Sequence, residues 1–250
     1  MISIIFPTLN EEAFIGQSIR SLKSRFNSIP YEIIVSDGKS KDRTVQIAEE
    51  AGAKVIAYTG EKRQTIAQGR NDGAKAASGE FVAFMDADCS IIEPDHFFGK
   101  IMEHFKRDPK LVAVNVSIRV LPEFETFADR WIFKLFNHYL WLMNNVLHIG
   151  MSAGEFQMIR KDIFDSLHGY NETLVASEDV DLFARLAKVG KVRFENSLTI
   201  YHTGRRGHAV GWPKLLSLWI LNSVWMMTTG HAYVKEWKPI RLHKLSDDDK

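Results

Sequence analysis

Four short apolar runs in the first 88 residues, each separated from the next by a segment with helical spacing, constrain the fold more than any other feature of the chain. In the first of these segments Ile15, Ile19 and Leu22 recur three or four positions apart, in a helix expected to open at Asn10-Glu11-Glu12. Strands that alternate with helices of this length form a parallel sheet with helices on both faces. We therefore predict an α/β fold with a Rossmann-like, mostly parallel central sheet, whose first strands are 2–6, 31–36, 54–57 and 81–85.

The second half is less regular. Its patterns predict a helix over 94–106, a strand over 111–120 and a long aromatic helix over 123–149. The remaining predicted elements are a strand at 152–159, helices at 161–167 and 178–189, short strands near 192–195 and 198–202, and an apolar C-terminal segment at 215–227. The acidic end, 247–250, is expected to be a frayed tail.

Composition excludes several classes of protein. A net charge of +1 gives no sign of nucleic-acid binding. One cysteine, Cys89, excludes an intramolecular disulfide framework and favours a reducing, cytoplasmic location. We expect no signal peptide, because the run at 2–6 is short and lacks a basic flank, and no spanning helix, because no run reaches roughly 18 apolar residues.

Polar residues follow each predicted strand of the first half. Ligands of parallel sheets bind at the carboxyl ends of the strands, so these residues should line one rim. They are Pro7-Thr8, Asp37-Gly38, the loop before Arg63, and Asp86-Ala87-Asp88.

The two carboxylates after the fourth strand are one residue apart. Side chains at i and i+2 share a side of a strand, so Asp86 and Asp88 can face one small volume. Clustered acids repel unless a positive group lies between them, and a hard divalent cation with oxygen ligands suits that place. An ordinary solvated turn is the alternative for this pair taken alone.

Two further groups can supply chemistry. Glu178-Asp179 begins a helix, where an acid either complements the helix dipole or acts as a general base. His202 with Arg205 and Arg206 forms either a basic surface turn or a site for a metal and phosphate oxygens. A cation beside arginines suits a diphosphate leaving group, and a carboxylate across the cleft suits activation of an acceptor alcohol. Together these groups indicate transfer of a sugar from a nucleotide diphosphate.

Five segments in this order resemble the family 2 glycosyltransferases of GT-A fold: 3–12, 32–38, 69–74 with 79–80, 85–88, and 177–182. The resemblance implies an inverting transferase that uses a UDP- or GDP-linked sugar and Mg²⁺ or Mn²⁺. The Gln-x-x-Arg-Trp signature of processive synthases does not follow Asp179, which favours a single transfer over polymerisation.

The resemblance also implies roles for individual residues. Asp179 would be the catalytic base, Asp88 the principal metal ligand, and His202 a third ligand beside Asp86, which would also face the ribose. The nucleotide sugar would be bound by Pro7, Thr8, Glu11, Asp37, Arg63, Arg70, Asp86, Ala87, Glu178 and Arg205. Residues 1–212 would form the catalytic domain, with a nucleotide-binding half, 1–90, and an acceptor half, 91–212, followed by an apolar helix and tail, 213–250.

The aromatic segments at 124–149 and 215–227 have three possible roles. They can pack on the core, form a peripheral membrane face, or form a homodimer interface. A lipid-linked acceptor would explain both segments, with the protein then on the cytoplasmic face of a membrane.

Two other functions share some of these features. A nucleotidyltransferase has a similar sheet and metal site, but it normally carries a Gly-rich basic loop where this chain has Pro7-Thr8-Leu9-Asn10-Glu11-Glu12. A non-catalytic module that binds a nucleotide sugar or a lipid would not need the full set of acids.

Overall fold

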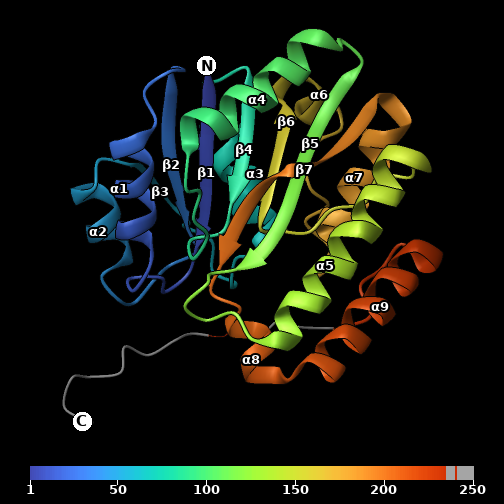
Figure 1. Ribbon diagram of the computed structural model, residues 1–250. Coiled ribbons are helices and arrows are strands. Elements are labelled where there is room, and N and C mark those ends of the chain that lie inside the picture. Colours follow the sequence, from blue (N-terminus) through green and yellow to red (C-terminus); the bar gives the residue numbers. More distant parts are fainter. Residues whose placement is uncertain (235–239, 241–250) are drawn as a thin grey trace.

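The structure, a computed structural model, describes residues 1–234 and 240. In this part of the chain seven strands form one sheet, in the order β3-β2-β1-β4-β6-β5-β7 (Figure 1). The strands are β1 Ile2–Thr8, β2 Tyr31–Asp37, β3 Lys54–Ala57, β4 Phe81–Met85, β5 Leu111–Val120, β6 Phe156–Arg160 and β7 Lys191–His202. All pairs are parallel except those of β6, which runs antiparallel to both β4 and β5. The predicted α/β class with a mostly parallel sheet is confirmed.

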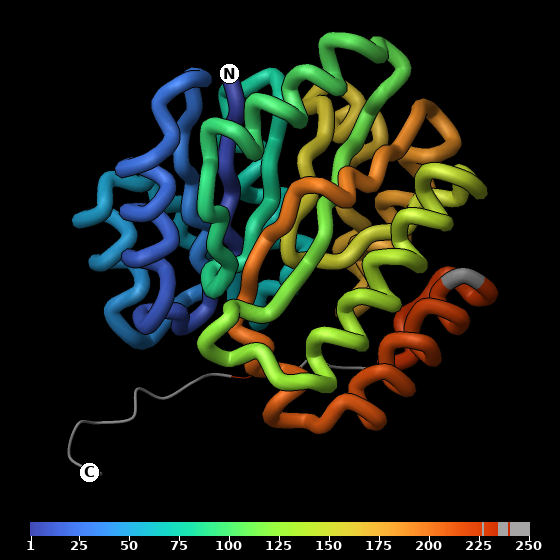
Figure 2. Tube along the Cα trace, in the orientation of Figure 1, coloured from blue at the N-terminus to red at the C-terminus, as the bar shows by residue number. Residues whose placement is uncertain are grey.

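Helices cover both faces of the sheet, as the tube in Figure 2 shows. One buried cluster joins the sheet to α1, α4 and α5, and the other joins it to α3, α6 and α7. The helices are α1 Ile15–Arg25, α2 Thr44–Glu50, α3 Ile66–Lys75, α4 Pro94–Arg107, α5 Phe127–Trp141, the π-helix η1 Leu142–Val146, α6 Lys161–Ser166, α7 Glu178–Val189, α8 Arg205–Val210 and α9 Trp212–Thr229.

The predicted end of the first strand at Pro7 was wrong, because β1 continues to Thr8 and pairs with β2 throughout. Pairing of β1 with β4 stops at Ile5 and Phe84, so Pro7 lies where β1 has one neighbour. A residue without a backbone N–H is tolerated in such a position.

The predicted start of the first helix at Asn10 was also wrong. Asn10 has a φ of 56°, a left-handed conformation that a right-handed helix cannot include. The chain here is fastened to the loop before α2 instead, because the backbone N–H groups of Asn10 and Glu11 donate to the hydroxyls of Ser40 and Thr44 at 2.7 Å each. The helix then begins at Ile15.

In the second half the predicted long helix is interrupted. Regular α-helix ends at Trp141, and one π-helical turn follows. Within it the buried side chain of Asn144 accepts from the Met151 N–H and donates to the Met151 carbonyl, both at 2.8 Å, which turns the chain toward β6. The strand predicted at 152–159 starts only at Phe156, and the two short strands near 192–202 are one bulged strand, β7.

The C-terminal apolar segment is a helix, α9, which is longer than predicted. The predicted acidic tail at 247–250 lies outside the described residues.

A buried carboxylate joins α5 to α8 and α9. Asp129, which is fully buried, accepts hydrogen bonds from the Trp212 indole at 2.7 Å and contacts the His208 ring at 2.8 Å. It also completes a capping box with Thr126 at the start of α5. This one side chain therefore sets how α8 and α9 are placed against α5.

Replacement of this carboxylate should destabilise the fold. We expect Asp129→Ala to lower the free energy of unfolding by about 2–4 kcal/mol, because the Trp212, His208 and Thr126 donors lose a buried acceptor. Urea denaturation followed by tryptophan fluorescence would measure the change. The matched control is Asp165→Ala, which removes an exposed ion pair with Lys161 and should change stability by less than about 0.5 kcal/mol. Equal effects of the two variants would contradict the assigned role.

Candidate functional site

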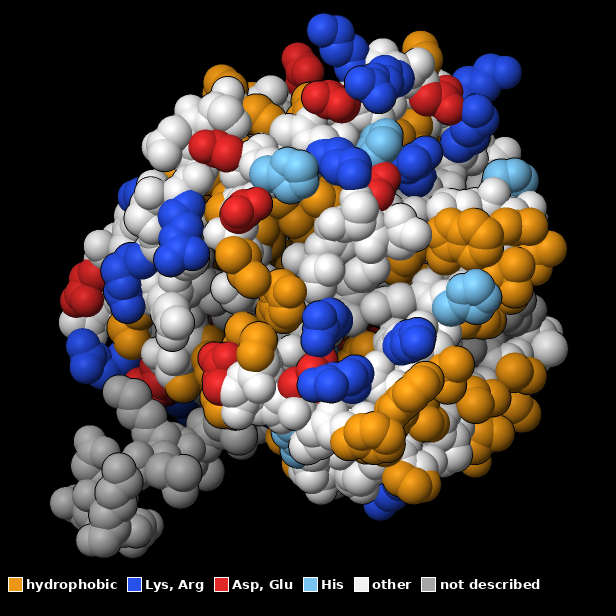
Figure 3. Space-filling model, viewed as in Figure 1, with side chains coloured by type: hydrophobic (Ala, Val, Ile, Leu, Met, Phe, Trp, Pro, Cys, Tyr) orange, Lys and Arg blue, Asp and Glu red, His pale blue; other side chains and the backbone are white. Residues whose placement is uncertain are grey.

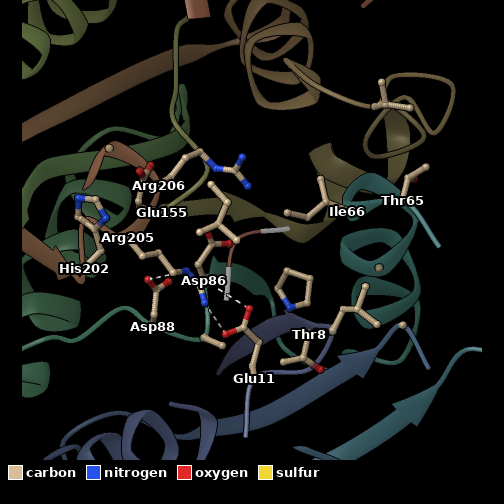
Figure 4. Close-up of a pocket in the computed structure, with 18 of the residues that line it drawn as sticks. Thr8, Glu11, Thr65, Ile66, Asp86, Asp88, Glu155, His202, Arg205 and Arg206 are labelled. Carbon is tan, nitrogen blue, oxygen red and sulfur yellow. Dashed lines mark hydrogen bonds and ion pairs between the residues drawn. The ribbon is translucent and has the colours of Figure 1, made fainter. Parts of the chain in front are cut away.

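A cavity of about 510 Å³ lies at the carboxyl ends of β1, β2 and β4 (Figure 4). This volume is in the range of small-molecule sites. Both halves of the chain contribute to its walls. The predicted site residues that line it are Pro7, Thr8, Glu11, Arg63, Asp86, Ala87, Asp88, His202 and Arg205. The predicted rim is thus one continuous surface.

Arg205 connects two of these elements through charge. Its guanidinium donates to both carboxylate oxygens of Glu11, at 2.8 and 3.0 Å, and its Nε lies 3.2 Å from Asp88 Oδ2. Figure 4 shows the three side chains pointing toward one another. Asp88 also accepts a hydrogen bond from the Thr203 hydroxyl at 2.5 Å. The start of α8 is therefore held against the loops that follow β1 and β4.

Asp86 lies in the same wall and is more exposed, with 31% of its side chain accessible against 7% for Asp88. Burial raises the pKa of its carboxyl to about 6, against the lowering effect of Arg70, whose guanidinium is 3.5 Å away. Asp88 adds to the rise because two like charges at one place disfavour ionisation. A cation that enters beside these two carboxylates would relieve that repulsion.

His202 lines the cavity, but its hydrogen bonding does not favour binding of a metal. Its Nε2 is buried and finds no hydrogen-bond partner among the described residues, and its ring edge packs on Phe133 with centroids 5.0 Å apart. Burial lowers its pKa to about 4, so the ring is neutral at pH 7. The Gly204 N–H donates to Nδ1 at 3.3 Å, which places the ring proton on Nε2. In this arrangement Nε2 is a donor, and it could ligate a metal only if the Gly204 bond were released.

Four predicted residues are not among those that line the cavity. Asp37 is 2% exposed and is held by the hydroxyls of Thr8 and Ser40, at 3.2 and 2.5 Å. The other three, Arg70, Glu178 and Asp179, form a largely buried charged group next to Asp86, in which Asp179 is partly exposed.

Arg70 is the centre of that buried group. It is 1% exposed, and its guanidinium donates to Glu178 at 2.8 Å and to the Gly154 carbonyl at 3.0 Å. It also lies over the Tyr170 ring, 5.2 Å from its centroid. The sequence analysis expected Arg70 to bind the nucleotide sugar, but in the structure its guanidinium contacts other protein groups.

Asp179 follows Glu178 in the first turn of α7. Burial and the neighbouring Glu178 raise the pKa of its carboxyl to about 7, against Arg70, which lowers it. A carboxyl with a pKa close to neutral is suited to accept a proton at physiological pH. One of its oxygens accepts from the Val180 N–H at 2.8 Å.

The sequence-based reasoning missed Glu155, which lines the cavity. Burial and the nearby Asp86 raise the pKa of this carboxyl to about 8. Because β6 runs antiparallel to β4, its first residue pairs with the last of β4, and the Glu155 carbonyl accepts the Asp86 N–H at 3.4 Å. The residues 154–155 carry no local signal of this, since the direction of β6 alone brings them to the rim.

The aromatic side of the cavity was missed as well. The inner sides of α5 and α9 contribute Phe133, Trp212, Leu215 and Trp219. These rings pack edge to face, with Phe133 and Trp212 at 5.4 Å and Trp212 and Trp219 at 6.1 Å between centroids. The cavity is therefore polar and charged on one side and aromatic on the other.

The residues present fit a divalent cation that arrives with a ligand of its own. Among the described residues, no three His, Cys, Asp or Glu side chains form a complete metal site. Two carboxylates of the cavity, Asp86 and Asp88, nevertheless offer the oxygen ligands that Mg²⁺ and Mn²⁺ use. Magnesium is commonly held by one or two carboxylates together with substrate phosphates, and this set corresponds to that arrangement.

Comparison with known proteins gives one family. The sequence model of the family described as Glycosyl transferase family 2 matches residues 3–167. A dolichyl N-acetyl-α-D-glucosaminyl phosphate 3-β-D-2,3-diacetamido-2,3-dideoxy-β-D-glucuronosyltransferase of Methanococcus voltae is 33% identical over 132 residues, which cover 49% of this chain and 40% of that protein. A β-monoglucosyldiacylglycerol synthase of Trichormus variabilis is 24% identical over 241 residues, covering 88% of this chain and 51% of the relative. The chain thus spans about half the length, or less, of these two curated relatives.

Solved structures share the architecture. A mannosyltransferase from Pyrobaculum calidifontis, in complex with GDP-Man and Mn²⁺, superposes with a TM-score of 0.63 at 17% identity, covering 81% of this chain and 56% of that one. This similarity shows a common GT-A fold.

Removal of the buried Arg70 guanidinium should lower the stability of the fold by an amount that depends on pH. We expect Arg70→Met to lower the free energy of unfolding by about 3–5 kcal/mol, because the buried Glu178 loses its ion-pair partner and the partly exposed Asp86 loses a nearby positive charge. Since Arg70 lowers the folded-state pKa values of Asp86 and Asp179, these values rise further in the variant. The deficit should therefore grow as the pH rises above about 6, where these carboxyls ionise in the native protein, and shrink in acid.

Chemical denaturation at several pH values would measure this. The control is Arg63→Met, at an exposed arginine that also lines the cavity, which should change stability by less than about 0.5 kcal/mol. A deficit of Arg70→Met that did not vary with pH would contradict the assigned ionic role.

Proposed function

Because the chain belongs to glycosyl transferase family 2, whose model matches residues 3–167, we propose that it transfers a sugar from a nucleotide diphosphate to an acceptor hydroxyl. One observation carries the proposal. The Asp86-Ala87-Asp88 segment at the end of β4 opens into a cavity of nucleotide-sugar dimensions that Arg63, Arg205 and Arg206 also line.

The first half would bind the donor. Pro7, Thr8 and Glu11, from β1 and the turn after it, line the side next to Gly38, where a nucleoside would lie. Asp37 would act through Thr8, which it holds by a hydrogen bond. The guanidiniums of Arg63 and Arg205 would face the diphosphate, since arginine pairs with phosphate oxygens through two parallel hydrogen bonds.

Asp86 and Asp88 would hold Mg²⁺ or Mn²⁺ together with the donor diphosphate. When bound, such a cation neutralises the charge that develops on the leaving diphosphate. Arg205 now pairs with Asp88 and Glu11, so it would turn part of its guanidinium toward phosphate oxygens as the donor enters. His202, in its present tautomer, would donate from Nε2 to an oxygen of the donor, or would ligate the cation after release of Gly204.

Asp179 would be the general base. The acceptor hydroxyl oxygen forms a bond to the anomeric carbon, the bond from that carbon to the diphosphate oxygen breaks, and the hydroxyl proton passes to the Asp179 carboxylate. A single displacement of this kind inverts the anomeric configuration. Arg70 and Glu178 would position Asp179 from behind the wall.

Glu155 would stand on the acceptor side as a neutral carboxyl, which can donate a hydrogen bond to a sugar or acceptor oxygen. The acceptor itself would occupy the aromatic side, where Phe133, Trp212 and Trp219 offer flat apolar surfaces. It would be a free or lipid-linked alcohol.

Donor binding should depend on a divalent cation. In a thermal-shift screen of UDP- and GDP-linked sugars, we expect one donor class to raise Tm with Mn²⁺ or Mg²⁺ and to lose most of that effect in EDTA, because a ligand stabilises only the state that binds it. Asp88→Asn should abolish the cation-dependent part. Asp108→Asn, at an exposed ion pair with Lys191, is the control and should respond like the native protein. An equal shift for Asp88→Asn and native protein would rule out Asp88 as a ligand.

Asp179→Asn should lower kcat/KM for transfer by about 10²–10⁴-fold, the range typical of a lost general base. In the native enzyme kcat/KM should fall about tenfold per pH unit below pH 7, because protonation of Asp179 removes the base. NMR of the product would show inversion at the anomeric carbon.

Two variants bound this assignment. Glu155→Gln keeps a hydrogen-bond donor and should cost less than tenfold, while Glu49→Gln, at an exposed residue of α2, should have no effect. The opposite result, a loss of about 10²–10⁴-fold in Glu155→Gln with little loss in Asp179→Asn, would identify Glu155 as the base.

A further inference from the structure

Two rows of apolar side chains on α5 and α9 remain open to solvent. On α5 they are Phe127, Trp131, Leu135 and Tyr139, each four residues after the last, and on α9 they are Ile220, Leu221, Val224 and Trp225. Their exposed fractions run from 39% at Tyr139 to 77% at Phe127. We call these eight residues the apolar face. Figure 3 shows hydrophobic side chains gathered over the α5 and α9 side of the molecule.

The residues of the apolar face do not belong to the hydrophobic core. The opposite sides of the same helices are already packed, with Phe133 and Leu140 of α5 and Leu215 of α9 no more than 2% exposed. Rows spaced by four residues on two helices form a continuous patch, whereas scattered exposed apolar residues need no explanation. Such a patch marks an interaction surface.

The exposed charges carried by the two helices themselves are all basic. The exposed charged residues of α5 and α9 are Arg130, Lys134 and Lys214, and the one acid of the two helices, Asp129, is fully buried. The Lys134 ammonium lies 4.8 Å from the Trp131 ring centroid, and Arg130 also contacts Glu125 at the rim. A second copy of this face would bring the same cations together, and Glu125, which precedes α5, is already paired with Arg119 and Arg130.

Anionic lipid headgroups supply the charge that a second copy lacks. Trp131, Tyr139 and Trp225 are half-exposed aromatics of the kind that lie at headgroup depth, and aliphatic side chains such as Leu135 and Val224 suit the acyl boundary. Within the described residues no helix has the length and apolarity to cross a bilayer. Contact would therefore be made by the surfaces of α5 and α9 lying along the membrane.

The apolar face also adjoins the cavity. Phe133 and Trp219 line the aromatic wall from the inner sides of α5 and α9, and Phe136 stacks on Trp219 with centroids 5.7 Å apart. A bilayer against the outer sides of these two helices would lie next to the acceptor side of the cavity. An acceptor with a hydroxyl or phosphate head on a lipid tail could then reach the site without leaving the membrane.

We propose that the apolar face of α5 and α9 docks on an anionic bilayer and that the acceptor is lipid-linked. The docking follows from the face itself, whereas the acceptor class rests on the proposed glycosyl transfer. The two are separated by testing docking without any nucleotide sugar.

The test is flotation of the full chain with vesicles of phosphatidylcholine alone and with 30% phosphatidylglycerol. The native protein should float with the anionic vesicles and much less with the neutral ones, and 0.5 M NaCl should weaken binding because exposed charges are screened. Lys134→Glu with Lys214→Glu should reduce partitioning by roughly fivefold or more per residue, since each basic residue near an anionic surface contributes about that factor. Leu135→Glu with Val224→Glu should abolish it.

Matched controls lie on the α4 side of the molecule. Ile92→Glu, at a side chain 54% exposed, and Lys106→Glu, at an exposed residue of α4, should float like the native protein. All the exchanged positions are exposed, and far-ultraviolet circular dichroism would confirm the fold of each variant. The thermal shift by donor and cation should be the same in every variant, so loss of flotation with intact donor binding reports on the face alone.

Three results would overturn the docking. The first is that the native protein does not float with anionic vesicles. The second is that the Leu135→Glu, Val224→Glu double variant floats as well as the native protein. The third is that light scattering shows a native dimer and a monomeric double variant, while neither protein binds vesicles. If the protein docks and binds the donor, the acceptor class is tested by comparing transfer rates. Transfer to a short-chain soluble acceptor should be slower than transfer to a polyprenyl phosphate or glycolipid in the same vesicles, and equal or faster transfer to the soluble acceptor would overturn a lipid-linked acceptor. Failure of donor binding in all proteins would instead remove the proposed glycosyl transfer and leave docking in place.

Discussion

The buried charge of Arg70 is the interaction on which the rest of the structure depends. A guanidinium that is 1% exposed is stable only if counter-charges and acceptors surround it. Those partners come from three places in the chain: Asp86 after β4, the Gly154 carbonyl before β6, and Glu178 at the start of α7. Arg70, a side chain of α3, needs all three partners, and two of them belong to the second half of the chain. Its burial therefore holds the second half of the chain against the first. It also ties Asp86 of the cavity wall to Glu178, which precedes the proposed base Asp179.

The cavity has two kinds of wall, and each has its own origin. The polar wall is made of strand ends and turns, where backbone geometry leaves little freedom. The aromatic wall is made of helix sides, whose position depends on Asp129 and its contacts with Trp212 and His208. The first wall is the proposed donor side of the cavity, and the second is the proposed acceptor side.

Local patterns were enough to predict the first-half strands and the rim, because Pro7-Thr8, Asp86 and Asp88 follow directly from where apolar runs end. They were not enough where tertiary direction decides. Glu155 reaches the cavity only because β6 is antiparallel, and Arg70 turns inward because acids encoded about a hundred residues later surround it. The helix start at Asn10 failed for a similar reason, since Ser40 and Thr44, about thirty residues later, hold the backbone of Asn10 and Glu11 outside the helical conformation. The role of the aromatic helices could not be decided from the sequence. The spacing of their apolar residues predicts apolar side chains on two sides of each helix, but it does not show which side packs on the protein core.

The insertion of β6 between β4 and β5 has a consequence for synthesis of the chain. One edge of β4 pairs with β1, but the other must wait for Phe156, 71 residues after Met85 (156 − 85). At ribosomal rates of roughly 5–20 residues per second that interval is about 4–14 s. During this time a fully apolar central strand has an open edge and Arg70 has no partner from α7. In a nascent chain of this design the candidate site is therefore complete only after β6 and α7 have been made.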